Sequence, residues 1–210
     1  MKWKMKICLL LAAATAFAAG GCVKLSQSRQ KIEFYTLEYD TGSAENAVPI
    51  PVVIRVERFT AAPPYNTNRM VYREQPFLRE AYHYHKWRAS PADLTAYFIA
   101  RDLARSGIFE GVHPPGSIAS ASHILEGTAD EFHERDLPDR WESVLSITVA
   151  LMKEREPDPA KRLVFQRVYS FTEICRDKTP RSVAEAMSTA MSRATTALAD
   201  DIRRALSRDP

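Results

Sequence analysis

The chain has 210 residues, of which 45% are hydrophobic and 26% are charged. Its 29 Lys and Arg residues nearly balance its 26 Asp and Glu residues and form no basic block, which argues against a nucleic-acid-binding protein. Three cysteines are too few for a disulfide-stabilised scaffold, and the length suits one domain with a hydrophobic core.

Residues 1–21 have the pattern of an export signal. Three lysines lie within residues 1–6, residues 7–18 are apolar, and small residues lead into Cys22. This ending resembles the bacterial lipobox, in which the cysteine is acylated and becomes the new N-terminus. The alternative is an ordinary secretory signal with an incidental cysteine. The apolar run is too short for a membrane-spanning helix, which needs about 20 residues.

The sequence therefore predicts a lipoprotein signal peptide at 1–21, a lipidated tether at 22–32 and a single domain at 33–210. Without the three lysines of the signal, 26 basic residues face 26 acidic ones, so the mature chain is formally neutral. Cys175 is then the only cysteine besides Cys22. It ends an apolar, strand-like segment, and we interpret it as a core or edge residue and not as a nucleophile.

The first half of the domain reads as strands followed by one helix. Alternation and β-branched residues predict four strands, at 33–39, 51–59, 69–73 and 80–87. The segments 40–49 and 60–68 are rich in turn residues and are expected to be loops. The helix begins after Ser90, a good N-cap that precedes a proline, and ends at Gly107, which suits a left-handed cap.

The second half reads as a hairpin series and a long helix. A loop at 113–120 precedes three predicted strands, at 122–133, 141–153 and 162–175. Short polar turns between long strands imply an antiparallel meander. The last helix begins after Thr179, and its apolar residues recur at helical spacing as far as Leu206.

Two amphipathic helices combined with this many strands indicate an α+β fold. The expected architecture is a two-layer sandwich, in which a twisted, mostly antiparallel sheet has the two main helices packed on one face. The strand that follows the first helix can pair in either direction.

The sequence offers no catalytic set. It has no G-x-S-x-G motif, no G-x-G-x-x-G motif and no P-loop. His83 and His85 lie two residues apart on a predicted strand, so both imidazoles could approach one metal ion from the same face. Two ligands do not complete a metal site, and we predict no enzyme activity, no cofactor and no metal.

Aromatic and arginine side chains are instead concentrated between residues 65 and 87. Tyr, Trp and Arg contribute much of the binding energy at protein interfaces, although they also complete the packing of a sheet. The candidate partner-binding residues are Tyr65, Arg69, Tyr72, Arg73, Tyr84 and Trp87.

Several motifs follow one another in a familiar order along the domain. They are Phe34-Tyr35-Thr36-Leu37, Pro63-Pro64-Tyr65 with Arg69-Met70-Val71-Tyr72-Arg73, Tyr82 to Trp87 with Pro91 and Leu94, Pro114-Pro115-Gly116, and Leu125-Glu126-Gly127. With the lipobox-like Cys22, this order resembles the ABC-type transport auxiliary lipoproteins, a family that includes the PqiC-like lipoproteins. The resemblance extends over nearly the whole mature chain.

The resemblance implies a non-catalytic accessory subunit of a transport system that contains an MCE-domain protein. Such systems move lipids or other hydrophobic molecules between the two membranes of Gram-negative bacteria. The lipid on Cys22 would anchor the chain, and Val23 and Lys24 would favour the outer membrane, facing the periplasm. Partners would be the membrane and the MCE-domain protein, and a homo-oligomer is possible.

Two other functions remain open from the sequence. The chain could itself bind a lipid or another apolar ligand in the periplasm, between helices and sheet or in a channel formed by several copies. It could also be an envelope metalloenzyme that uses His83 and His85.

Overall fold

The computed structural model describes residues 30–41 and 48–207 of the chain. The chain divides into two compact units, residues 1–31 and 32–210, and every helix and strand of the described residues belongs to the second. The predicted signal peptide, Cys22 and most of the predicted tether lie outside the described residues.

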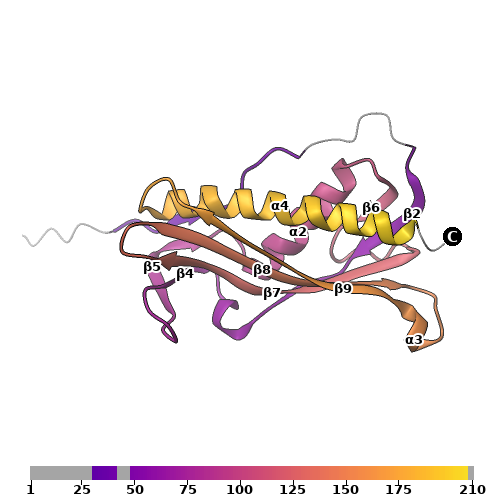
Figure 1. The fold of residues 1–210 in the computed structure, drawn as a ribbon, viewed down its shortest axis with the longest axis horizontal. Coiled ribbons are helices and arrows are strands. Elements are labelled where there is room, and N and C mark those ends of the chain that lie inside the picture. Colours follow the sequence, from indigo (N-terminus) through magenta and orange to yellow (C-terminus); the bar gives the residue numbers. More distant parts are fainter. Residues whose placement is uncertain (1–29, 42–47, 208–210) are drawn as a thin grey trace, which may run out of the picture. The chain divides into compact units, whose positions relative to one another are not determined.

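Among the described residues, the second unit contains nine strands, three α-helices and one 3-10 helix (Figure 1). The strands are β1 (Glu33–Tyr35), β2 (Ile50–Val56), β3 (Thr60–Ala61), β4 (Arg69–Arg73), β5 (Glu80–Trp87), β6 (Phe109–His113), β7 (His123–Asp136), β8 (Trp141–Lys153) and β9 (Leu163–Ile174). The helices are η1 (Pro63–Tyr65), α2 (Pro91–Arg105), α3 (Pro159–Arg162) and α4 (Pro180–Leu206).

The sheet is mixed and is organised around β7. On one side β7 pairs antiparallel with β8, which pairs antiparallel with β9. On its other side β7 pairs in parallel with β2, β3 and β4 at successive positions. β6 pairs in parallel with β2, while β5 pairs antiparallel with β4 and in parallel with β1. The predicted meander is confirmed for the long strands, whereas the N-terminal strands are mainly parallel.

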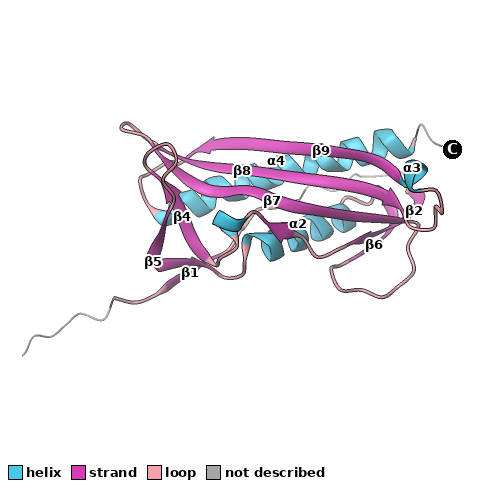
Figure 2. Cartoon of the chain, turned by 90° about the horizontal axis from the view of Figure 1, so that it is seen from below, coloured by secondary structure: helices cyan, strands magenta, loops and turns pink. Residues whose placement is uncertain are grey.

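Helices α2 and α4 lie on the same side of β7, β8 and β9, and Figure 2 shows these strands in front of both helices. The strands direct alternate residues toward the helices. Leu145, Ile147, Val149 and Leu151 of β8 are all completely buried. The α+β class is therefore confirmed, with the helices packed on a curled sheet.

Helix α2 begins and ends as its sequence predicts. The side chain of Ser90 accepts a hydrogen bond from the backbone N–H of Asp93 at 3.2 Å, and Pro91 occupies the first turn. Gly107 has φ +66°, a left-handed conformation that glycine adopts without a steric penalty. Burial of Phe98, Ile99 and Leu103 against the sheet and α4 holds the helix in place.

Helix α4 confirms the predicted apolar stripe. Its N-cap is Thr179, which accepts from the backbone N–H of Ser182 at 3.2 Å. The buried stripe consists of Val183, Met187, Ala190, Met191, Ala194, Leu198 and Ile202, none more than 1% exposed. Small alanine side chains at this stripe allow the helix backbone to approach the sheet.

The predicted strand at 33–39 is too long. Only β1 is a strand, and the chain then leaves the sheet to cross α4 and α2. The backbone N–H of Glu38 donates to Ser188 Oγ at 3.0 Å, and the hydroxyl of Tyr39 donates to Asp102 Oδ2 at 2.6 Å. Leu37 is 3% exposed. Side-chain contacts with the helices therefore override the strand pattern.

The structure contains four short elements that the sequence pattern missed. The expected loop at 60–68 includes β3 and η1, and a parallel strand, β6, follows α2. Helix α3 precedes β9, with Asp158 as its N-cap. Each element is five residues or shorter, which is too short for hydrophobic periodicity to identify.

Candidate functional site

Strands β1, β4 and β5 form the region that carries most of the predicted partner-binding residues. Tyr72 and Arg73 of β4 pair with Glu134 and Arg135 of β7, which attaches the region to the long strands. β1 pairs with the last residues of β5. We call β1, β4, β5 and the loop 74–79 the β1–β4–β5 region.

Two of the predicted partner-binding residues lie in the core. Trp87 is 1% exposed, and its ring meets Phe132 edge to face with 5.1 Å between centroids. Tyr65 is 4% exposed, and its ring stacks on that of His133 at 5.5 Å. Both aromatic rings therefore stabilise the packing of η1 and β5 on the sheet and have little free surface.

Arg69 holds an irregular part of the β4–β5 pairing. The register between the two strands shifts between Arg69 and Val71. The guanidinium of Arg69 donates to the carbonyl oxygens of Ala81 at 2.7 Å and Tyr82 at 2.9 Å. A guanidinium can donate to two acceptors at once, so Arg69 stabilises this part of β5 with its side chain.

Tyr72 and Arg73 are half-buried on β4. The hydroxyl of Tyr72 donates to Glu80, and its ring lies 4.8 Å from that of Tyr82. The contact with Glu80 and partial burial raise the pKa of Tyr72 to about 12, so its hydroxyl stays protonated at neutral pH. Both residues belong to the inner part of the region.

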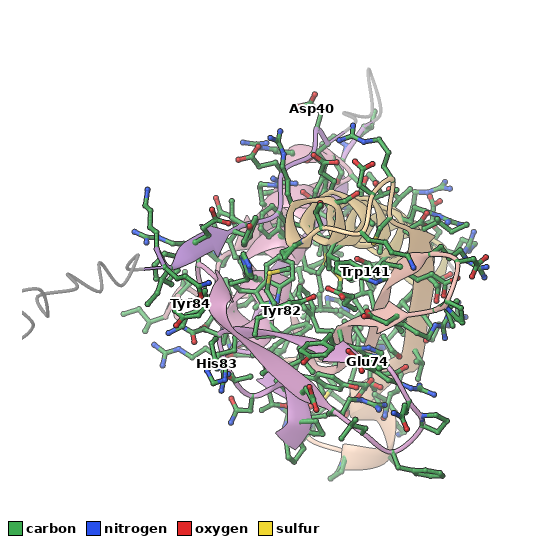
Figure 3. All side chains as sticks on the ribbon, turned by 90° about the vertical axis from the view of Figure 1, so that its left-hand side faces the viewer. Asp40, Glu74, Tyr82, His83, Tyr84 and Trp141 are labelled. Carbon is green, nitrogen blue, oxygen red and sulfur yellow. The ribbon has the colours of Figure 1, made fainter. Side chains whose placement is uncertain are left out.

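Tyr84 is 44% exposed and belongs to a group of exposed apolar side chains. Figure 3 shows His83 and Tyr84 on the outer side of β5 and Tyr82 nearer the interior. We define the exposed apolar group by its members in the β1–β4–β5 region: Phe34, Phe77, Leu78 and Tyr84. The guanidinium of Arg88 lies over the ring of Phe34 at 5.4 Å.

Phe77 is the most unusual member of this group. Its side chain is fully exposed, and its backbone has φ +68°, a left-handed conformation that is disfavoured for a bulky residue. No packing of the ring offsets that cost, because the side chain meets solvent on all sides. Residues held in disfavoured backbone conformations are concentrated at functional sites.

A buried carboxyl group of β7 lies next to Tyr82 of β5. Glu134 is 1% exposed, and the hydroxyl of Tyr82 donates to its Oε1 at 2.9 Å. Burial, followed by the neighbouring carboxylate of Asp136, raises the pKa of Glu134 to about 9. Glu134 is therefore protonated at neutral pH and can donate a hydrogen bond as a neutral acid.

His83 and His85 have different neighbours. His83 Nδ1 lies 3.3 Å from the guanidinium of Arg69, and His85 Nδ1 lies 3.4 Å from Glu33 and 3.3 Å from the hydroxyl of Tyr35. Among residues 30–41 and 48–207, no three His, Cys, Asp or Glu side chains are grouped to hold a metal ion.

Cys175 is 6% exposed, as expected of a core residue. Burial, the largest cause, raises the pKa of its thiol to about 11, which keeps the reactive thiolate rare at neutral pH. The thiol therefore lacks the activation expected of a nucleophile.

Sequence reasoning missed Phe34, Phe77 and Leu78 as exposed residues and Glu134 as a buried acid. The signal in the sequence that could have indicated the exposed group is the adjacent pair Phe77 and Leu78, which lies in the turn between two predicted strands. No local signal distinguishes Glu134 from neighbouring acids such as Glu131, because its burial depends on the packing of β4 and β5 against β7.

No described helix combines the length and apolar character needed to cross a membrane. The sequence matches no protein-family model and no curated protein.

The fold, however, occurs in solved structures. Protein XCC0632 from Xanthomonas campestris, described as DUF330, has a TM-score of 0.74 at 17% identity, with 84% of this chain and 98% of that one covered. An uncharacterized protein has a TM-score of 0.65 at 14% identity, covering 82% and 99%. The hypothetical protein CT253 from Chlamydia trachomatis has a TM-score of 0.52 at 9% identity, covering 76% and 100%. At these identities the similarity shows that the chain shares the fold of a DUF330 protein.

Proposed function

We propose that this protein is a lipid-anchored, non-catalytic accessory subunit of an envelope transport system. Its lipid on Cys22 would hold it at the outer membrane, facing the periplasm, and its folded unit would dock an MCE-domain protein for the transport of lipids or other hydrophobic molecules. The observation that carries the proposal is the export signal ending at Cys22, followed by motifs that resemble the ABC-type transport auxiliary lipoproteins.

The structure supports docking through the exposed apolar group of the β1–β4–β5 region. Phe34 is 49% exposed, Tyr84 is 44% exposed and Phe77 is fully exposed, so burial against a partner would remove apolar surface from water. Strand β5, which carries Tyr84, is held in place by the hydrogen bonds that Arg69 donates to it. Trp87, the last residue of β5, is buried in the core. Restriction to a membrane surface raises the local concentration of a partner and allows weak contacts to suffice.

The first test removes the anchor. We expect Cys22→Ala to leave the folded unit intact and to abolish function in the cell, measured as failure to complement a deletion strain in an envelope-permeability assay. Circular dichroism of the purified variant checks the fold. Full complementation by Cys22→Ala would show that the anchor is incidental.

The second test addresses the docking surface. We expect Phe77→Asn to retain the parent's stability or gain about 0.5 kcal/mol, because asparagine tolerates the left-handed conformation better. The same change should reduce recovery of the MCE-domain partner in a pull-down from envelope extracts at least about fivefold, since an exposed aromatic anchor is lost.

Ile118→Asn is the matched control, because Ile118 is equally exposed but lies in the loop between β6 and β7. Equal partner recovery by the parent, Phe77→Asn and Ile118→Asn would remove this surface from the proposal. Failure of the intact parent to recover any MCE-domain protein would refute the proposed partner.

A further inference from the structure

A second surface feature is the free edge of strand β9. Four of the described strands pair with one other strand only, namely β1, β3, β6 and β9. The first three are three, two and five residues long, whereas β9 has twelve residues. Figure 2 shows β9 as the outermost of the three long strands, with α4 behind it. β9 is therefore the one long edge of the described sheet.

The backbone along this edge has unpaired hydrogen-bonding groups. Pairing of β9 with β8 is regular from Phe165 to Ile174, and the register shifts only near Leu163. In the described part of the chain, no backbone hydrogen bond joins residues 166–174 to anything other than β8. Alternate residues of an antiparallel strand direct their N–H and C=O groups to opposite sides. About half of these groups therefore face away from β8 and are available to another strand.

β9 lacks several of the features by which edge strands avoid pairing. Natural edge strands are commonly short, or they carry proline, lysine or a bulge. Residues 166–174 contain neither proline nor lysine, and they include β-branched and aromatic residues that favour strands. Val168 and Ile174 are 63% and 65% exposed. A strand added at this edge would thus gain backbone hydrogen bonds and cover apolar surface.

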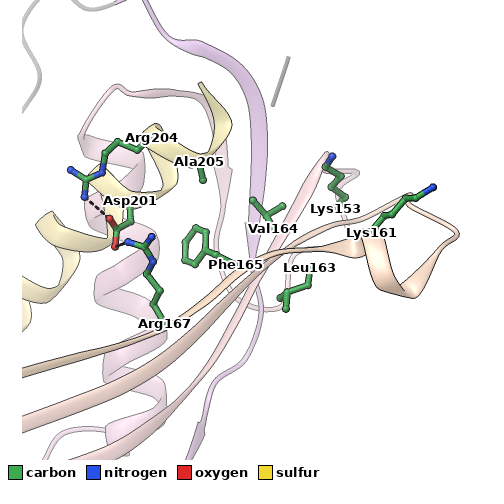
Figure 4. A pocket seen from close by; sticks show the side chains of 9 residues that line it. All are labelled: Lys153, Lys161, Leu163, Val164, Phe165, Arg167, Asp201, Arg204 and Ala205. Carbon is green, nitrogen blue, oxygen red and sulfur yellow. Dashed lines mark hydrogen bonds and ion pairs between the residues drawn. The ribbon is translucent and has the colours of Figure 1, made fainter. Parts of the chain in front are cut away.

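The two charged residues of this segment restrict the partner. Arg167 and Glu173 point toward α4, where Arg167 contacts Asp201 at 2.6 Å and Glu173 contacts Arg193. Figure 4 shows Asp201 between Arg204 and Arg167. Arg167 uses one terminal nitrogen and Glu173 one oxygen in these contacts, so each retains hydrogen-bonding capacity. Charges on the inner face of an edge oppose an apolar partner strand and favour one that places the opposite charge beside each.

β9 itself has the complementary order of charges. When β9 pairs antiparallel with β9 of a second copy about a two-fold axis at Ser170, Arg167 lies opposite Glu173 of that copy, and symmetry repeats the contact. Side chains directly opposite each other have Cβ atoms about 5 Å apart, so both pairs can form ion pairs. An axis at Val168 or Tyr169 would instead set Arg167 against an aromatic ring.

We propose that β9 pairs antiparallel with β9 of a second copy of this chain, about a two-fold axis at Ser170. The paired segments are residues 166–174, so the start of β9, which follows α3 and contains the register shift, stays outside the interface. The sheets of the two copies join into one, and Val168 lies opposite Thr172 of the second copy. This interface shares no residue with the β1–β4–β5 region and does not depend on the docking function proposed above.

The oligomeric state of the full-length protein in a non-ionic detergent tests the partner. We expect analytical ultracentrifugation to find mainly dimers at about 50 µM, as for a micromolar dissociation constant. Ser170→Lys places two lysine side chains opposite each other at the axis and should weaken the dimer about fivefold or more. Gln166→Lys is the matched control, because Gln166 is exposed on the same face but lies opposite Ile174; it should weaken the dimer less than about twofold.

Charge reversal at the axis tests the geometry. Ser170→Glu alone should weaken the dimer as Ser170→Lys does, because two carboxylates then meet. An equimolar mixture of the two variants should restore dimers, since their opposite charges face each other only if position 170 meets itself. Equal melting temperatures of the parent and both variants, measured by circular dichroism, check that the folded unit is intact.

A cysteine at the axis measures the register directly. Opposed Cα atoms in an antiparallel pair are about 4.5–5.5 Å apart, within the range of a disulfide. Under mild oxidation Ser170→Cys should therefore link two chains, whereas Val168→Cys on the same strand should not, because Val168 faces Thr172 of the second copy. The parent chain shows any linkage through its own cysteines.

Three results would contradict the proposal. A monomeric parent at this concentration would overturn the second copy as the occupant of the edge and leave it to a strand of another protein. Equal dimer strength in the parent, Ser170→Lys and Gln166→Lys would place the interface elsewhere. A mixture of Ser170→Lys and Ser170→Glu that stays monomeric, or linkage through Val168→Cys in place of Ser170→Cys, would overturn the axis at Ser170.

Discussion

Two buried carboxyl groups, Glu134 of β7 and Asp201 of α4, have opposite charge states. Glu134 and Asp201 are 1% and 8% exposed, and each accepts a hydrogen bond from a tyrosine hydroxyl. The pKa of Glu134 is raised to about 9, whereas that of Asp201 is lowered. Burial acts in the same direction on both, so their other neighbours decide the outcome.

The neighbours differ in charge. Asp201 has Arg167 and Arg204 as ion-pair partners, and their positive charges offset the cost of burying a carboxylate. Glu134 has the acidic side chain of Asp136 nearby, which adds repulsion to burial. The comparison shows that burial alone does not set the charge of an acid. It also predicts that replacing each carboxyl group by an amide has opposite effects on stability above neutral pH.

The largest expected effect is a fall in stability with rising pH that depends on Glu134. The folded chain keeps a proton on Glu134 up to about pH 9, whereas the unfolded chain releases it near the ordinary value of 4.5. Between these values the folded state binds more protons, so raising the pH favours unfolding, by an amount on the order of a few kcal/mol.

Urea unfolding at pH 5 and pH 8.5 measures this effect, and Glu134→Gln should reduce it. Because glutamine is neutral at both pH values, the variant should be more stable than the parent by about 2 kcal/mol at pH 8.5 and nearly equal to it at pH 5. The same pH dependence in parent and variant would assign the effect to another group.

The next effect is a loss of stability on removal of the charge of Asp201. Asp201→Asn should cost about 2 kcal/mol at pH 7, because Arg167 and Arg204 lose their shared carboxylate while Tyr169 keeps an oxygen acceptor. Asp200→Asn is the matched control, since Asp200 is 47% exposed and should change stability by less than about 0.5 kcal/mol. Chemical denaturation of both variants makes the comparison, and equal losses would contradict it.

The smallest expected loss of stability comes from removing the hydroxyl group of Tyr82, which donates a hydrogen bond to Glu134. Tyr82→Phe should cost about 1 kcal/mol, since it removes the hydrogen bond to Glu134 but keeps the ring against Tyr72. Tyr84→Phe, on the exposed side of β5, should be nearly neutral. A double-mutant cycle of Tyr82→Phe with Glu134→Gln measures the coupling, and zero coupling would show that the two groups do not interact.

The parts of the fold that the sequence predicts correctly are long and locally encoded. Helix α4 is recognisable because its apolar stripe repeats over many turns, and β8 because Leu145, Ile147, Val149 and Leu151 alternate with smaller or polar residues. Helix α2 is recognisable from Ser90 and Gly107 at its ends. These signals depend on residues close in the chain, so they persist without knowledge of the tertiary structure.

The strand pairing and the candidate surface depend on residues far apart in the chain. β7 pairs with β2, β3 and β4 on one side, and each of those strands is too short or too irregular to indicate a partner. The same limitation applies to the aromatic residues. Trp87 and Tyr65 resemble interface residues in sequence but are buried, whereas Phe77 is exposed in a turn.

The sequence by itself determined the residues of the long helices and strands, the lipobox-like pattern at Cys22 and the near neutrality of the mature chain. Only the tertiary structure decided which aromatic rings face solvent and which acids keep a charge. Exposure and pKa depend on groups brought together from distant segments, such as Tyr82 beside Glu134 and Arg167 beside Asp201.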